Sequence, residues 1–171
     1  MAAGSFLKSA CVLLAIAAGA ARCAFPDGSA TVQAVCPPRA AFTSVSPFLE
    51  DGCGTVDCHG QPSRPLRIMG YYGLRLSPTD FPGGNPTTVA EVDANWESVC
   101  GLQPELMTSV VMGQASPGTL LLLMKPLNET HHKGGAVILA GSDGETCLTS
   151  WLSGSVDGGA CARAAAAQRQ P

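Results

Sequence analysis

Eight cysteines in a chain of 171 residues constrain this protein more than any other feature of its sequence. Such a density in a small chain indicates either disulfide bridges formed in an oxidising compartment or a metal site. The choice between these two depends on the compartment to which the chain is sent.

The N-terminal segment has the pattern of a secretory signal peptide. Lys8 is the only charged residue among the first 21, and an apolar run follows it at 9–20. This run is too short to span a bilayer and has the length of a signal-peptide core. We therefore expect residues 1–23 to be removed and the mature protein to be secreted into the extracellular space.

Cysteine parity helps to place the cleavage site, which lies between Ala21 and Ala24. Cleavage after Ala21 leaves seven cysteines, whereas cleavage after Cys23 leaves six, an even set that can form three bridges. The later site is favoured for that reason. The candidates for disulfide bonds are then Cys36, Cys53, Cys58, Cys100, Cys147 and Cys161. The interval from Cys147 to Cys161 suits a bridge between two neighbouring extended segments.

The charge balance excludes one broad class of partner. Removal of Lys8 and Arg22 takes the basic count from 10 to 8 against 13 acidic residues, a net charge of −5. A broad basic face is therefore absent from the expected surface, and we expect no nucleic-acid partner. No second apolar run reaches the length of a membrane span, so we also expect no membrane insertion.

One cysteine cluster has the composition of a metal site. Cys53, Cys58 and His59 have a loose ligand spacing that His131 or His132 would complete. The secretory context favours disulfides over zinc for these cysteines. We therefore expect no metal and no cofactor.

A glycosylation sequon marks a surface loop. Asn128 is the acceptor of the only Asn-x-Ser/Thr sequon without proline, and we predict that it carries a glycan. His131 and His132 follow it without any nucleophile motif beside them. The scattered carboxylates show no spacing that suggests acid–base work, so we expect no enzyme.

Short apolar runs between turn residues predict an all-β fold. The candidate strands are 41–45, 66–76, 106–112, 119–125, 136–140 and a segment around Trp151 and Leu152. Their spacing favours a β-sandwich. Two glycines, Gly70 and Gly73, indicate a bulge or a close backbone approach within 66–76.

One segment predicts a helix instead. Thr88 and Glu91 form a capping-box pattern, and Val89, Val92, Trp96 and Val99 then fall on one helical stripe. We expect a helix at 89–99. The domain as a whole is predicted to be a disulfide-stabilised β-sandwich with one short helix over 24–162. We expect a disordered tail at 163–171, with a frayed helix as the alternative.

Four segments occur in an order and spacing typical of a known family. They are Gly73-Leu74-Arg75-Leu76, Pro86 followed by the capped helix and Cys100, the loop from Asn128 to Lys133 leading to Cys147, and the Cys147 to Cys161 interval with Gly158 and Gly159. Together they resemble the secreted immune-evasion domain of poxviruses. That family includes the viral CC-chemokine inhibitor and the parapoxvirus inhibitor of GM-CSF and interleukin-2.

The resemblance implies a β-sandwich and a function. It implies a secreted viral decoy that binds a host chemokine or cytokine and blocks receptor engagement without catalysis. It also implies that Arg75 lies on the ligand-binding face, and strand alternation would present Arg75 opposite Leu74 and Leu76. The alternative is an envelope-associated accessory glycoprotein, held by a membrane-anchored viral partner.

Overall fold

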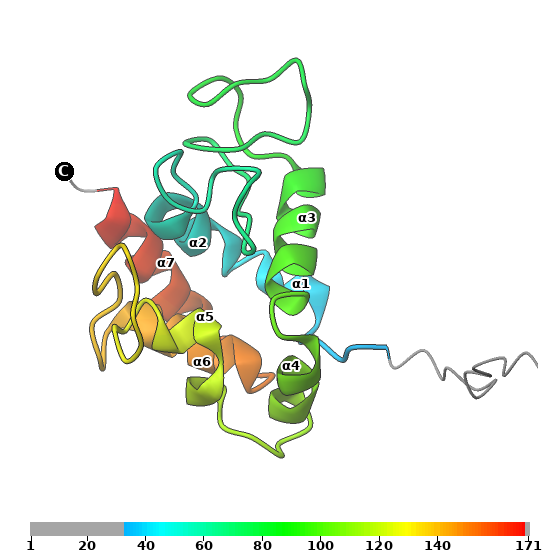
Figure 1. Cartoon of the computed structure of the whole chain (residues 1–171), viewed down its shortest axis with the longest axis vertical. Helices are drawn as coiled ribbons and strands as arrows, with labels where there is room; N and C mark the ends of the chain where they lie inside the picture. The colour runs from blue at the N-terminus through cyan, green and yellow to red at the C-terminus, as the bar shows by residue number, and fades with distance from the viewer. Residues whose placement is uncertain (1–32, 170–171) are drawn as a thin grey trace, which may run out of the picture. The chain divides into compact units, whose positions relative to one another are not determined.

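The computed structural model describes residues 33–169, and this part of the chain is helical, not all-β (Figure 1). The elements are α1 (Arg39–Phe42), α2 (Ser46–Cys53), α3 (Val89–Cys100), α4 (Pro104–Val111), the 3-10 turn η1 (Pro117–Thr119), α5 (Leu121–Met124), α6 (Asp143–Leu152) and α7 (Gly158–Gln168). The β pairing described in this range is one isolated bridge between Met69 and Leu74. The predicted β-sandwich over 24–162 is therefore wrong. The predicted signal peptide at 1–23 lies outside the described residues.

Helix α6 occupies the segment around Trp151 and Leu152 that was predicted as a strand. Its buried side chains include Cys147, Leu148, Trp151 and Leu152. Their spacing of one, four and five residues follows the stripe of a helix rather than the alternation of a strand. Acidic residues in the first turn of α6 also favour the helix, because they face the positive end of its dipole.

Helix α4 replaces the predicted strand at 106–112. Pro104 begins this helix, and the fixed φ of proline suits a first helical turn. Met107 and Val110 are buried, three residues apart on one face. The β-branched valines near its end favour a strand by propensity, but the packing of this face decides for the helix.

Residues 163–168 were expected in a disordered tail, but they form the C-terminal half of α7. Alanine has the highest helix propensity, and Asp157 caps the helix by accepting a hydrogen bond from the Ala160 N–H at 2.9 Å. The small side chains of Ala160, Ala164 and Ala165 are buried. They let α7 pack closely against α2 and α6 (Figure 1).

The hydrophobic core lies among these helices. The rings of Phe42 and Trp151 meet with centroids 5.1 Å apart. Other side chains that are almost fully buried are Val45, Phe48, Leu49, Ile68, Val99, Met107, Leu120, Leu123, Leu148 and Leu152. The core therefore draws on residues from both ends of the described chain.

The helix predicted at 89–99 is confirmed as α3. Both halves of its capping box form: the Thr88 hydroxyl accepts from the Glu91 N–H, and the Glu91 carboxylate accepts from the Thr88 N–H. Val99 is buried, and the half-buried Trp96 donates its indole N–H to the carbonyl of Pro37 at 3.0 Å. Val89 is 79% exposed, so it lies off the buried face.

The predicted strand at 66–76 is an irregular loop around the Met69–Leu74 bridge. The close backbone approach predicted from its glycines is confirmed. A Cβ on Gly73 would collide with the carbonyl oxygen of Gly54, and one on Gly70 would lie 2.9 Å from the Glu50 side chain. This loop therefore packs directly on α2 and on the residue that follows it.

The remaining predicted strands are also absent. Residues 41–45 form the end of α1 and a turn, residues 119–125 form the end of η1 and α5, and residues 136–140 have neither helical nor extended pairing. Among residues 33–169 no helix combines the length and the apolar character that a membrane span requires.

Candidate functional site

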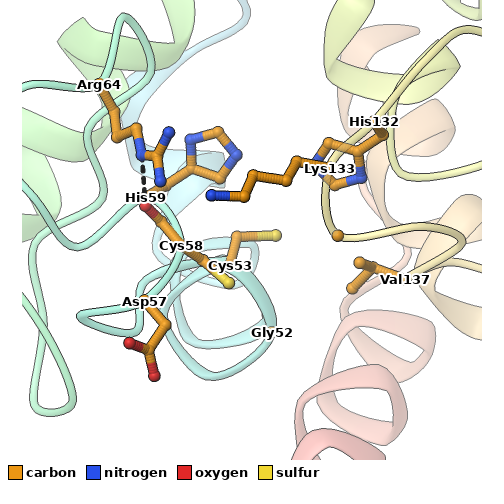
Figure 2. A pocket seen from close by; sticks show the side chains of 10 residues that line it. Gly52, Cys53, Asp57, Cys58, His59, Arg64, His132, Lys133 and Val137 are labelled. Carbon is orange, nitrogen blue, oxygen red and sulfur yellow. Dashed lines mark hydrogen bonds between the residues drawn. The ribbon is translucent and has the colours of Figure 1, made fainter.

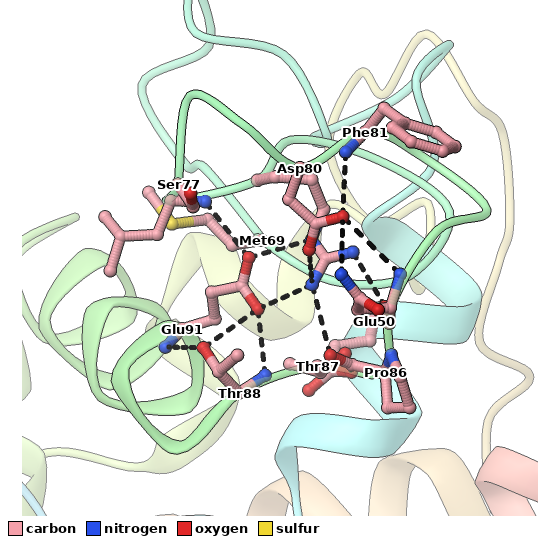
Figure 3. A network of polar contacts seen from close by, with 12 residues as sticks. Glu50, Met69, Ser77, Asp80, Phe81, Pro86, Thr87, Thr88 and Glu91 are labelled. Atoms are coloured by element: carbon pink, nitrogen blue, oxygen red, sulfur yellow. Dashed lines mark hydrogen bonds and ion pairs between the residues drawn. The ribbon is translucent and has the colours of Figure 1, made fainter.

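Arg75, which the resemblance placed on an exposed strand, is buried. It belongs to a polar network that includes Asp80 and Glu91, both of which are labelled in Figure 3. Its guanidinium donates to both carboxylate oxygens of Glu91, at 2.8 and 3.0 Å, and lies 2.8 Å from the Asp80 carboxylate. It also donates to the backbone carbonyls of Asn85 and Pro86 at 2.7 and 3.1 Å. The side chain of Arg75 is 2% exposed. The predicted exposure of Arg75 on a strand is therefore wrong, because its side chain is buried and its contacts lie within the chain. Its role in ligand binding stays a prediction.

The error has a simple cause in the backbone. The alternation argument required an extended strand, and residues around Arg75 form a loop in which the two faces do not alternate. Leu76, expected in the core, is 49% exposed. The arginine instead joins the loop to the first turn of α3.

Glu91 connects three parts of this network. Burial alone would raise the pKa of Glu91, but hydrogen bonds from the Arg75 guanidinium, the N–H groups of Thr88 and Leu76, and the Thr88 hydroxyl lower it to about 2. Glu91 is therefore ionised at neutral pH. One carboxylate both caps α3 and fixes the position of Leu76.

Apolar side chains are exposed in the loop formed by residues 70–84, which we call the aromatic loop. The exposed fractions are 38% for Tyr71, 46% for Tyr72 and 65% for Phe81, in addition to Leu76. The rings of Tyr71 and Tyr72 meet edge to face with centroids 4.8 Å apart. The Gly83 N–H donates to the carbonyl of Tyr71 at 2.7 Å. The contacts of the Arg75 guanidinium and the hydrogen bond from Gly83 to Tyr71 thus hold the backbone of this loop in place.

Four of the six disulfide candidates form bridges. Cys36 pairs with Cys100, and Cys147 pairs with Cys161. The second bridge joins α6 to α7, not two extended segments. Disulfides of this kind form in oxidising compartments, so both bridges are compatible with a secreted protein. Cys53 and Cys58 remain thiols.

These two thiols line a pocket of about 270 Å³ between the loop after α2 and the loop before α6 (Figure 2). We call it the thiol pocket. Cys58 and His59 lie on one side, and His132 and Lys133 approach from the other, with the Lys133 side chain directed across the pocket. The rings of His59 and His132 are stacked, with centroids 6.2 Å apart. The fold therefore brings together the two histidine-containing segments that the sequence singled out.

Each of these two imidazole rings has a defined hydrogen-bond partner. Nδ1 of His59 lies 3.0 Å from the carbonyl of Leu66, and Nδ1 of His132 lies 2.9 Å from the carbonyl of Gly135. A carbonyl only accepts, so Nδ1 carries a proton in both rings. Burial lowers the pKa of His59, which keeps this ring neutral at pH 7.

The arrangement lacks the features of a nucleophile or a metal centre. Burial raises the pKa of the Cys53 thiol to about 12, with a smaller contribution from the neighbouring Cys58. An activated cysteine has a lowered pKa instead. Within residues 33–169 no group of three or more His, Cys, Asp or Glu side chains is arranged to hold a metal ion. The Cys53 thiol is therefore not an activated nucleophile.

Cys53 is expected to resist alkylation in the native protein. At pH 7.5 a pKa of about 12 leaves roughly a thousandfold less thiolate than an ordinary cysteine has. In a Cys58→Ala variant, iodoacetamide should label Cys53 at least about a hundredfold more slowly in native protein than in urea-unfolded protein. Mass spectrometry of timed samples measures both rates, and equal rates would contradict the raised pKa of this half-buried thiol.

Asn128 lies on the surface, as the sequon predicted. It is exposed in the chain between α5 and α6, and it adopts a positive φ of 60°. Asparagine tolerates this left-handed conformation better than most residues. A glycan at Asn128 stays a prediction, and its attachment site is accessible.

The basic residues around the pocket were missed in the sequence. Arg64, Lys125 and Lys133 line this region together with the histidines. The signal available was the run His131-His132-Lys133, which places three nitrogen bases in one loop. The contributions of Arg64 and Lys125 depend on chain segments that only the tertiary fold brings together.

Comparisons of this chain with protein families, with curated proteins and with solved structures find no match. The resemblance to the poxvirus family therefore stays a prediction that nothing tests, and the sandwich fold that it implied is not the fold of residues 33–169.

Proposed function

We propose that the mature protein is a secreted, non-catalytic binding protein that attaches to another protein through the aromatic loop. In the function implied by the resemblance, the partner is a host chemokine or cytokine whose receptor engagement is blocked. The sheet face first expected to carry this contact is absent from the described residues. The aromatic loop takes its place in the proposal.

One observation carries this proposal: large apolar side chains are exposed on a loop whose backbone is held by buried contacts. Tyr71, Tyr72, Leu76 and Phe81 are all more than a third exposed. Tyrosine is enriched at the energetic centres of protein interfaces, and clustered surface apolar groups are typical of interaction sites. The buried ion pair of Arg75 and Glu91 fixes the loop in advance, which reduces the entropy lost on binding.

Charge supports a basic partner. With residues 1–23 removed, the chain has 8 basic and 13 acidic residues, a net charge of −5. A net negative protein attracts a basic chemokine and increases its association rate at low salt. The contribution to the affinity itself comes mainly from the apolar side chains.

A second candidate is the accessory glycoprotein that a membrane-anchored viral partner holds at an envelope. The degree of exposure favours it, since Phe81 is 65% exposed and a permanent partner would keep such side chains from water. Both candidates use the same surface. They differ in whether the partner is present in the cell that produces the protein.

Variants of the aromatic loop test the proposal. We expect Phe81→Ser and Tyr72→Ser each to weaken partner binding about thirtyfold, the loss typical of an interface hot spot. The control is Met112→Ser, because Met112 is 60% exposed but lies after α4, outside the loop. All three variants should keep the wild-type melting temperature. Binding is measured by surface plasmon resonance against a chemokine and cytokine panel.

The producing cells provide the second arm of this experiment. Capture of the tagged protein should recover either a panel ligand from the medium, as the decoy requires, or a membrane-anchored viral protein from the cells. Phe81→Ser should lose that partner, whereas Met112→Ser should keep it. If both variants bind alike, the aromatic loop is not the binding surface.

A further inference from the structure

A cavity of about 340 Å³ extends from the thiol pocket into the interior of the helical domain. Its walls come from α2, α5, α6 and the loop that contains Leu66. They are formed mainly by Leu49, Leu66, Leu102, Leu122, Ile138 and Leu148. A cavity of this size and apolar character falls at the lower end of the range for small-molecule sites.

The mouth of this cavity has the opposite character. Arg64, Lys125 and Lys133 supply positive charges there, beside His131 and His132, and none of the lining residues is acidic. The whole chain has a net charge of −3, so this concentration of positive groups runs against its overall charge. An apolar interior below a basic rim matches a molecule with an apolar body and an anionic head.

The basic groups at the mouth are free to bind such a head. Among residues 33–169, Arg39, Arg75, Arg163 and Arg169 pair with carboxylates. The arginines and lysines of this range without an ion pair are Arg64, Arg67, Lys125 and Lys133. Three of these last four line the cavity.

The contacts that the mouth residues make leave several of their donors unused. Arg64 uses Nε on the carbonyl of Cys58 at 3.0 Å, which leaves its two terminal nitrogens. Lys125 donates to the carbonyl of His131 at 2.9 Å and has two further N–H groups. Lys133 is exposed and reaches across the thiol pocket (Figure 2).

We propose that this cavity binds a medium-chain fatty acid, with the acyl chain among the leucines and the carboxylate at Arg64 and Lys133. A planar guanidinium matches a carboxylate in geometry, and lysine adds a second positive charge. A single unbranched chain suits an apolar cavity of this volume that offers few polar partners inside. This site is separate from the aromatic loop and does not depend on the proposed function.

The acyl chain should supply most of the affinity. Each methylene removed from water contributes about fourfold, which corresponds to about 0.8 kcal/mol. Affinity should therefore rise from octanoate through decanoate to dodecanoate, and then stop rising once the chain fills the cavity. A series that is flat from the start would place the ligand outside the cavity.

Calorimetric titration of the secreted protein tests the head-group specificity. The probes are dodecanoate, dodecanol and dodecyltrimethylammonium, each kept below its micelle concentration. Dodecanoate should bind most tightly, dodecanol about tenfold more weakly, and the cationic probe should not bind measurably, because the mouth is positive. Equal binding of the three probes would overturn the proposal, because it would show an apolar cavity without anion selectivity.

Single substitutions locate the carboxylate. Lys133→Gln and Arg64→Gln should each weaken dodecanoate binding about tenfold while leaving dodecanol binding unchanged. Arg67→Gln is the matched control, since Arg67 is exposed, has no ion pair among the described residues and does not line this cavity. If Arg64→Gln disturbs folding, Lys133→Gln still tests the carboxylate site, because Lys133 is exposed and its replacement should not affect folding. Loss of binding in Arg67→Gln equal to that in Lys133→Gln would contradict the site.

Two further measurements distinguish a fatty-acid site from membrane binding and from the protein-binding loop. Vesicles containing anionic phospholipid should not bind the protein, and binding to vesicles without binding to dodecanoate would indicate a membrane surface instead. Phe81→Ser should bind dodecanoate like the wild type. The fatty-acid site and the protein-binding loop can therefore fail independently.

Discussion

An Arg75→Met variant is expected to lose about 3–5 kcal/mol of its free energy of unfolding at pH 7, a large share of the stability of a small domain. Removal of the guanidinium leaves the carboxylates of Glu91 and Asp80 without their counter-ion, and these side chains are only 2% and 9% exposed. The carbonyls of Asn85 and Pro86 lose their donor as well. Urea denaturation of purified protein measures the loss, and secretion should fall with it.

The control is Arg163→Met. Arg163 also pairs with a carboxylate, that of Asp143, but its side chain is 62% exposed. Exposed ion pairs contribute about 0–1 kcal/mol, because water and salt screen them. Equal losses in the two variants would show that the burial of the Arg75 network contributes nothing.

The pH dependence of stability tests the same network. The pKa of Glu91 falls from an ordinary 4.5 to about 2 in the folded protein. A lowered folded pKa gives stability that is complete above about pH 4.5 and is lost as the pH falls toward about 2. The difference between wild type and Arg75→Met should therefore narrow across this window. A difference that stays constant down to pH 2 would mean that ionised Glu91 is not the partner that matters.

Removal of the bridge between Cys147 and Cys161 is expected to be the other large effect. A Cys147→Ala/Cys161→Ala variant should lose about 3 kcal/mol, the value for a closed loop of this length. The sequence separation is 14, and both cysteines are fully buried between α6 and α7. The double substitution avoids a stray thiol. Thermal unfolding and secreted yield measure the change.

The other cysteines supply the comparisons. The bridge from Cys36 to Cys100 closes a separation of 64, so its removal should cost about 1 kcal/mol more. Cys53→Ala/Cys58→Ala removes two thiols and no bridge, so it should keep nearly all of the stability. Labelling of Cys147 or Cys161 by a thiol reagent in unreduced, unfolded protein would contradict the bridge.

The contrast between α3 and α6 shows how much of the fold could be predicted. α3 carries a capping box in its own sequence, so its existence and its start could be read locally. α6 has its buried residues at Cys147, Leu148, Trp151 and Leu152. That spacing could be read in the sequence, but a short apolar run is compatible with both a strand and a helix until the elements that pack against it are known. The family resemblance then favoured the strand.

The predictions for the C-terminal tail and for Arg75 were wrong for different reasons. The alanine-rich segment of α7 has no large apolar side chains, and it is ordered because its small side chains pack against α2 and α6. Arg75 meets Glu91 and Asp80 only after the loop has folded onto α3. The disulfide cysteines could be named from composition, whereas their pairing needed the fold.

The contacts of Glu91 determine how this domain unfolds locally. The same carboxylate caps the first turn of α3 through Thr88 and holds Leu76 and Arg75 in the aromatic loop. Neither part can be released while the other keeps its full set of contacts. The loop and the start of the helix therefore form a single cooperative unit of local unfolding. A partner that reshapes the loop would also have to fray the helix, which favours recognition of the loop in the conformation it already has.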